Sequence, residues 1–134
     1  MPGYLLDTDI CVYWMRGNTS LCQRFEKAGL ESLSISIISV AELFFGAYRS
    51  TKVDENLTQV DSFWGSLKVL PLHVNAMRIY GRIKAELQHA GSVIPDFDLL
   101  IASTALAYSL TLVTNNTRHY NRIPGLNLEC WIKS

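Results

Sequence analysis

Hydrophobic residues along the chain alternate between two spacings. Short apolar or alternating runs are typical of buried strands, and they are separated by longer segments with apolar residues at helical spacing. Strands are expected at residues 4–6, 33–38, 69–72, 111–113 and within 128–132. Helices are expected at residues 10–15, 19–28, 40–47, 57–64, 76–91 and 97–109. This alternation predicts an α/β fold with a mostly parallel sheet and helices on both faces.

Length and composition narrow the class of protein. The 134 residues fit one domain, taken as 1–134, and 49% hydrophobic residues with 18% charged residues exclude a disordered chain. Twelve Lys and Arg balance twelve Asp and Glu, which excludes a uniformly basic nucleic-acid-binding surface but not a local patch. The three cysteines lack zinc-knuckle spacing, and no signal peptide or bilayer-spanning run is seen, so we expect a cytoplasmic protein.

Acidic residues recur where the predicted strands end. Asp7 and Asp9 follow the first strand, Glu42 lies one turn into the helix after the second, and Asp98 lies near the start of the helix before the fourth. Ligands of parallel sheets bind outside the carboxyl ends of the strands. We therefore expect these carboxylates to lie near one another at that edge.

Each acid also has an ordinary explanation. Glu42 lies within a nearly continuous apolar segment, where a carboxylate must be ion-paired, protonated or bound to a cation. Asp98 could interact with a helix N-terminus, and Asp7 could cap a loop. One shared cause is simpler than three separate ones. A hard divalent cation fits because the set is all oxygen, and Mg²⁺ or Mn²⁺ is favoured over Zn²⁺. The chemistry indicated is phosphodiester hydrolysis by metal-activated water, although phosphatases share such acids.

Four runs along the chain carry a family resemblance. YLLDTDI (4–10), ISVAELFFGA (38–47), IPDFDLLIA (94–102) and LVTNNTRHYNRIPGL (112–126) resemble, in order and spacing, the PIN-domain ribonucleases of the VapC toxin family. The resemblance implies a Rossmann-like three-layer α/β/α domain. It also implies a Mg²⁺-dependent endoribonuclease, with Mn²⁺ able to substitute, that is the toxin of a type II toxin–antitoxin pair.

The resemblance assigns roles to individual residues. The family's catalytic and metal-binding acids fall on Asp7, Glu42 and Asp98. Supporting roles fall on Asp9, Asp96, Thr114 and Asn116, with a hydrogen-bonding role favoured for Asp9 and a helix N-terminal role for Asp96. Asn116 stands where many PIN nucleases have a fourth acid, so the number of metal ions is left open. Candidate RNA contacts are Lys84 and the basic group of Arg118, His119 and Arg122.

The resemblance also implies partners. These are structured RNA such as tRNA, and an antitoxin (VapB-like) whose tail anchors near Phe44, Phe45 or Tyr48 and places a basic residue over the acids. A surplus of aromatic residues predicts a homodimer; they are Trp14, Phe44, Phe45, Tyr48 and Trp64. Two alternatives stay open: a catalytically silent interaction module of the same fold, and a metal-dependent phosphatase or DNA nuclease, since the Asp7-Thr8-Asp9 spacing superficially offers a phosphatase pair.

Overall fold

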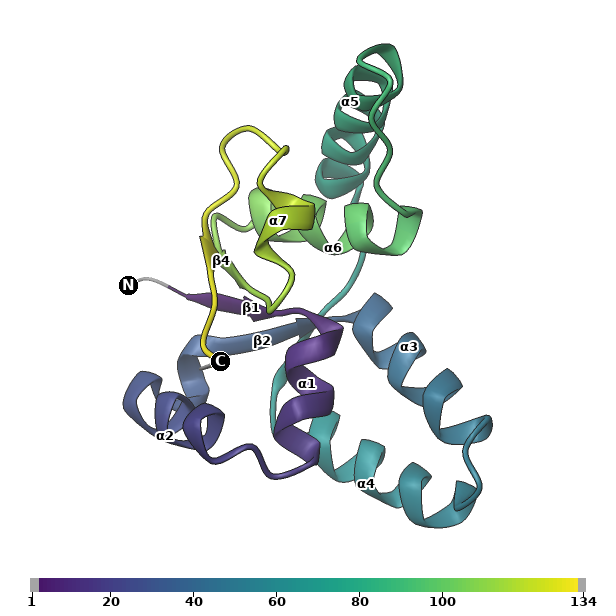
Figure 1. Ribbon diagram of the computed structural model, residues 1–134, viewed down its shortest axis with the longest axis vertical. Coiled ribbons are helices and arrows are strands. Elements are labelled where there is room, and N and C mark those ends of the chain that lie inside the picture. Colours follow the sequence, from purple (N-terminus) through teal and green to yellow (C-terminus); the bar gives the residue numbers. More distant parts are fainter. Residues whose placement is uncertain (1–2, 133–134) are drawn as a thin grey trace.

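The central feature of the fold is a parallel sheet. The computed structural model describes residues 3–132. In this part of the chain one sheet has the order β3-β2-β1-β4-β5, and every neighbouring pair is parallel (Figure 1). The strands are β1 (Tyr4–Leu6), β2 (Leu33–Ser36), β3 (Lys68–Leu70), β4 (Thr111–Val113) and β5 (Leu128–Glu129). The predicted α/β class is confirmed.

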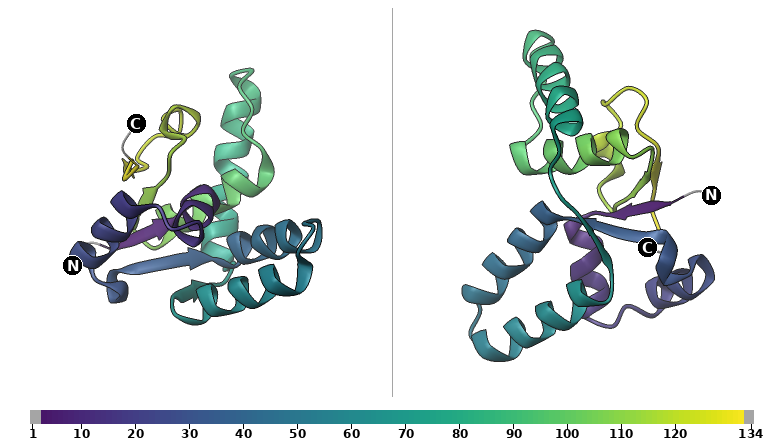
Figure 2. Two further views of the ribbon diagram at one scale, coloured as in Figure 1. Left: turned by 60° about the horizontal axis from the view of Figure 1, so that its bottom comes forward. Right: turned by 180° about the vertical axis from the view of Figure 1, so that it is seen from behind.

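Helices cover both faces of this sheet. They are α1 (Thr8–Met15), α2 (Thr19–Ala28), α3 (Ile37–Tyr48), α4 (Val53–Gly65), α5 (Val74–His89), α6 (Asp96–Ala107) and α7 (Thr117–Tyr120), with a 3₁₀ helix at Leu30–Ser32. Figure 1 shows α1 to α4 on one side of the strands and α5 to α7 on the other, and the reverse view in Figure 2 agrees. The domain therefore has three layers.

Two hydrophobic cores follow from this layering. Leu6 and Val113 belong to the core beneath α1 to α4, whereas their neighbours Leu5 and Leu112 belong to the core beneath α5 and α6. All four side chains have no exposed surface. A strand buried on both faces needs a continuous apolar run, which explains why the Tyr-Leu-Leu run forms the central strand.

An aromatic cluster fills the first core. Trp14 packs edge-on against Phe25, with ring centroids 4.0 Å apart, and against Phe63 at 4.8 Å. Phe25 also contacts Trp131 at 5.8 Å. Trp14 is partly buried against this core, so only part of its surface could add to the surplus that motivates a homodimer. Phe45 and Tyr48 on α3 are each 66% exposed and do add to it.

Several boundaries differ from the sequence predictions. The strand expected at 33–38 ends at Ser36, because the Ser36 hydroxyl accepts a hydrogen bond from the Ile38 amide and starts α3 there. The strand expected at 69–72 is Lys68–Leu70, and the one within 128–132 covers only Leu128–Glu129. Helix α7 and the 3₁₀ helix were not predicted, since neither is long enough to show a hydrophobic period.

The helices bear on one further expectation. None of the helices within residues 3–132 is long and apolar enough to cross a membrane. The cytoplasmic location itself stays a prediction.

Candidate active site

Asp7 lies at the centre of the carboxyl edge of the sheet. It follows β1 directly and caps α1, and its own amide donates to the Val113 carbonyl of β4. One carboxylate oxygen accepts from the Thr8 amide at 2.9 Å, and the other accepts from the Thr114 hydroxyl at 2.9 Å. Asp7 is only 6% exposed. The central strand and the start of a helix thus hold this carboxylate in one orientation.

The environment of Asp7 disfavours its negative charge. Burial is the main cause, and the nearby Asp9 carboxylate is the second; together they raise the pKa of Asp7 from 3.8 to about 7. The hydrogen bonds from Thr114 and Thr8 act in the opposite direction and are the smaller influence. A carboxylate placed this way binds a proton or a cation readily near neutral pH.

Asp9 lies in the first turn of α1, beside Asp7. Its Oδ2 accepts a hydrogen bond from the Asn115 amide at 3.0 Å, which ties α1 to the loop after β4. Burial raises the pKa of Asp9, with Asp98 contributing by repulsion. The predicted hydrogen-bonding role of Asp9 agrees with this contact, but its Oδ1 is buried without a hydrogen-bond partner within the described residues.

Glu42 is linked to the carboxyl edge of the sheet by hydrogen bonds that involve the hydroxyl groups of Thr8 and Ser39. The Thr8 hydroxyl lies 2.6 Å from Glu42 Oε1 and 2.9 Å from the Ser39 hydroxyl. Thr8 has one hydroxyl proton, and a carboxylate can only accept, so Ser39 donates to Thr8 and Thr8 donates to Glu42. Glu42 is half-buried. It faces outward from α3 although its neighbours in sequence are apolar. Among the described residues it forms no salt bridge.

Asp98 contacts His119, a residue that the sequence places among the candidate RNA contacts. It lies in the first turn of α6, and its Oδ2 is 3.1 Å from Nε2 of His119 on α7. Both side chains are partly buried, with 31% and 21% of their surface exposed. From the sequence, His119 falls with the basic residues that could contact RNA, because α7 is too short for its position to be predicted.

Thr114 and Asn116 connect α7 to Asp7. The Thr114 hydroxyl donates to Asp7 and accepts from the Asn116 amide at 3.0 Å. Thr114 is fully buried, whereas Asn116 is exposed. Thr114 therefore orients Asp7, and Asn116 contributes a backbone contact.

The other candidates engage different partners. Asp96 is exposed and accepts from Lys84 Nζ and from the Tyr80 hydroxyl of α5, each at 2.8 Å, and Lys84 and Tyr80 lower its pKa. Its carboxylate is thus hydrogen-bonded to α5.

Arg122 donates to the Ser92 hydroxyl and to the Val93 carbonyl, which holds the end of α7 against the loop before α6. Arg118 is exposed.

The carboxylate oxygens at this edge suit a cation that keeps part of its water shell. Within residues 3–132 no group of three His, Cys, Asp or Glu side chains stands in metal-coordinating geometry. Mg²⁺, however, is typically held by one or two carboxylates and keeps several water molecules. The raised pKa of Asp7 and the orphaned Asp9 oxygen both indicate uncompensated negative charge. The residues present therefore fit a hydrated hard cation rather than a fully dehydrated one.

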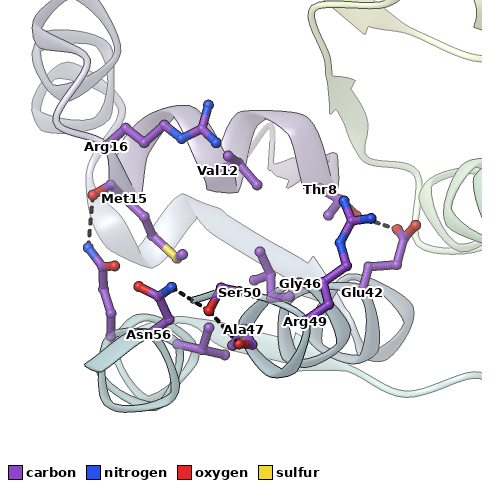
Figure 3. A pocket seen from close by; sticks show the side chains of 13 residues that line it. Thr8, Val12, Met15, Arg16, Glu42, Gly46, Ala47, Arg49, Ser50 and Asn56 are labelled. Carbon is purple, nitrogen blue, oxygen red and sulfur yellow. Dashed lines mark hydrogen bonds between the residues drawn. The ribbon is translucent and has the colours of Figure 1, made fainter. Parts of the chain in front are cut away.

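A pocket opens beside this edge, between α1, α3 and α4. Its volume is about 450 Å³, and Thr8 and Glu42 form one end of its lining (Figure 3). Arg16 and Arg49 line it from the positions directly after α1 and α3, and Val12, Met15 and Ala47 supply apolar surface. The pocket thus combines an apolar floor, two cations and an acidic end.

Comparisons with known proteins agree with this architecture. The family model of the PIN domain matches residues 4–126, and the chain therefore belongs to the PIN-domain family. It is 39% identical to "Ribonuclease VapC2" of Rickettsia felis over 132 residues, which cover 97% of this chain and 98% of the relative. It is 33% identical to the "tRNA(fMet)-specific endonuclease VapC" of Salmonella typhimurium over 131 residues, which cover 98% and 99%. Within the PIN family, it is a member of the VapC group of ribonucleases.

Solved structures place the same fold in two-component complexes. The DNA-bound VapBC of Salmonella typhimurium contains a chain that matches with a TM-score of 0.93 and 34% identity, covering 98% of this chain and all of that one. VapBC2 of Rickettsia felis, bound to a DNA fragment from its promoter, matches with a TM-score of 0.89 and 37% identity, covering 96% and 98%. The predicted family and the PIN-type fold are confirmed.

Proposed function

We propose that this chain is the toxin of a VapBC-type toxin–antitoxin pair and that it hydrolyses phosphodiester bonds in RNA. Its membership of the VapC ribonucleases supports the class of reaction. The observation that carries the proposal for this chain is Asp7. It is a buried carboxylate at the carboxyl end of the central strand, with its charge disfavoured and other acids around it.

The family implies dependence on a divalent cation, and the finer proposal is Mg²⁺, for which Mn²⁺ can substitute. Asp7, Asp98 and Glu42 would hold it, at least one of them through a water molecule, because the three side chains do not stand in coordinating geometry within residues 3–132. When bound, such a cation supplies a nucleophilic water and neutralises charge on the phosphate. An all-oxygen carboxylate set suits these hard ions.

The residues of the chain position the reacting groups. Thr114 and the Thr8 amide hold the two oxygens of Asp7, and the Thr8 hydroxyl holds Glu42. His119 is within hydrogen-bond distance of one oxygen of Asp98 and leaves the other oxygen free of that contact. Fixing carboxylates by hydrogen bonds lowers the reorganisation that cation binding requires.

RNA contacts would come from the basic residues near this edge. Arg118 is exposed and is the most available of them. Lys84 must exchange its contact with Asp96 for a phosphate, and Arg122 must give up its contacts to the loop before α6. Structured RNA such as tRNA is the proposed substrate, since one relative is named as specific for tRNA(fMet).

The pocket between α1, α3 and α4 would receive the tail of the antitoxin. Its apolar lining suits a hydrophobic anchor, and Thr8 and Glu42 lie at the end where a basic residue of the tail would meet the acids. The exposed Phe45 and Tyr48 of α3 remain candidates for further antitoxin contact or for a homodimer interface.

The function is tested by incubating the purified chain with tRNA, single-stranded DNA and a phosphomonoester, each with Mg²⁺ or with EDTA. We expect cleavage of RNA alone, only with Mg²⁺, and its loss in Asp98→Asn. Cleavage of DNA or of the phosphomonoester in preference to RNA would support the nuclease or phosphatase alternative. Inertness toward all three substrates would support a silent interaction module.

A further inference from the structure

Two buried oxygen atoms near the candidate active site have no hydrogen-bond partner among the described residues. They are Asp9 Oδ1 and the Tyr120 hydroxyl. Tyr120 is only 1% exposed, and its hydroxyl experiences the negative charges of Asp7, Asp98 and Asp9. It lies near Asp7, but the two groups do not meet in a well-formed hydrogen bond. Both atoms therefore belong to one small region at the carboxyl edge of the sheet.

Neither oxygen makes a hydrogen bond that holds the fold together within the described residues. The structural contact of Asp9 is made by its other oxygen, Oδ2, to the Asn115 amide. The Tyr120 ring packs in the core beneath α5 and α6, where a phenylalanine ring of nearly the same shape would fill the space. Buried polar atoms without partners lower the stability of a folded protein. Their presence beside the acids thus indicates a missing hydrogen-bonding partner, which must donate to the carboxylate oxygen of Asp9 and can also donate to the Tyr120 hydroxyl.

We propose that Asp9 Oδ1 and the Tyr120 hydroxyl form an outer wall of the cation site, where they accept hydrogen bonds from water molecules that surround the bound cation. This inference rests on the proposed function and extends its residue set beyond Asp7, Glu42 and Asp98. A cation that keeps several waters needs acceptors for them, which matches the lack of three directly coordinating side chains in the described region. Asp9 also adds negative charge that attracts the cation.

Two variants separate this role from a structural one. Asp9→Asn keeps an oxygen for the Asn115 amide and replaces Oδ1 with a donor group. Tyr120→Phe removes only the hydroxyl. If the oxygens serve the cation, each variant should unfold in EDTA at the same temperature as the parent or higher. Each should also bind Mn²⁺, followed by electron paramagnetic resonance, roughly tenfold more weakly.

Matched controls remove a charge or a hydroxyl elsewhere. Asp54 is exposed at the start of α4, and Tyr108 is exposed at the end of α6. Asp54→Asn and Tyr108→Phe should bind Mn²⁺ with the affinity of the parent.

Asp98→Asn distinguishes failure of this inference from failure of the proposed function. If Asp98→Asn loses Mn²⁺ binding while Asp9→Asn and Tyr120→Phe bind as the parent does, this inference is overturned and the proposed function stands. The same conclusion follows if the two variants unfold at lower temperature with unchanged affinity, since the oxygens would then be structural. If Asp98→Asn also binds as the parent does, both are overturned.

Discussion

Replacing Asp7 by asparagine should stabilise the cation-free protein at alkaline pH. The pKa of Asp7 is about 7 in the folded chain and 3.8 ordinarily. At about 1.4 kcal/mol per pKa unit, keeping this carboxylate charged costs the fold about 4 kcal/mol. The side-chain amide of the Asp7→Asn variant can still accept from the Thr8 amide and donate to Thr114, so we assign about 1 kcal/mol to weakened hydrogen bonding. The net gain is then about 3 kcal/mol at pH 8.5, by the same conversion of pKa to free energy.

The sign of the effect changes with pH. Between pH 4 and 7 the folded state binds a proton at Asp7 that the unfolded chain has released, so the parent loses stability as the pH rises through this window. Well above pH 7 the loss is complete. Below pH 4 both states are protonated, and Asp7→Asn should be less stable than the parent by about 1 kcal/mol.

Urea unfolding in EDTA from pH 4 to 9 measures this difference. The free energies of unfolding of the parent and of Asp7→Asn, plotted against pH, should cross. In a thermal scan at pH 8.5 the variant should melt about 10 °C higher, at roughly 3–4 °C per kcal/mol for a chain of this length. If the two free energies of unfolding change in parallel with pH and do not cross, the environment of Asp7 does not raise its pKa and the reasoning is refuted.

Packing and side-chain contacts lead to three more expected outcomes. Trp14→Ala should lower the free energy of unfolding by about 3–5 kcal/mol, because the Trp14 ring packs between Phe25 and Phe63. Trp64→Ala, at a more exposed position, should lower it far less. Equal losses of free energy for the two variants in urea titrations would contradict this expectation. His119→Phe should weaken Mn²⁺ binding roughly tenfold, whereas His119→Gln should bind Mn²⁺ with nearly the affinity of the parent. Equal affinities for the parent and both variants would show that His119 does not position Asp98. Phe45→Glu should convert a dimer into a monomer in sedimentation at tens of micromolar; a monomeric parent would remove the dimer prediction.

The spacing of hydrophobic residues along the sequence predicts most of the fold. The long helices α5 and α6 and the apolar strands β1 and β4 lie close to where the pattern indicates, because each buries a continuous apolar face. The end of β2 could not be read in the same way. Ile37 and Ile38 suit a strand, but capping by the Ser36 hydroxyl converts them to the first turn of α3.

The candidate site was predictable to a smaller extent. Parallel topology brings strand ends to one edge, which accounts for Asp7 and Thr114 meeting there. The contact of His119 with Asp98 depends on the four-residue helix α7, whose position is set by tertiary contacts such as the hydrogen bond from Arg122 to the Val93 carbonyl. Asp96 differs from Asp98 only in the direction in which the first turn of α6 projects it, and spacing alone cannot reveal that Lys84 lies on the other side.

The acids at the carboxyl edge of the sheet are proposed to hold a divalent cation for RNA hydrolysis. The most direct measurement is anomalous diffraction at the manganese edge from crystals of this chain soaked in Mn²⁺. We predict a peak beside Asp7 and Asp98, within coordinating distance of at least one of these carboxylates, that is absent from crystals of Asp98→Asn. A peak elsewhere, or none at this edge while Mn²⁺ still supports RNA cleavage, would contradict the claim.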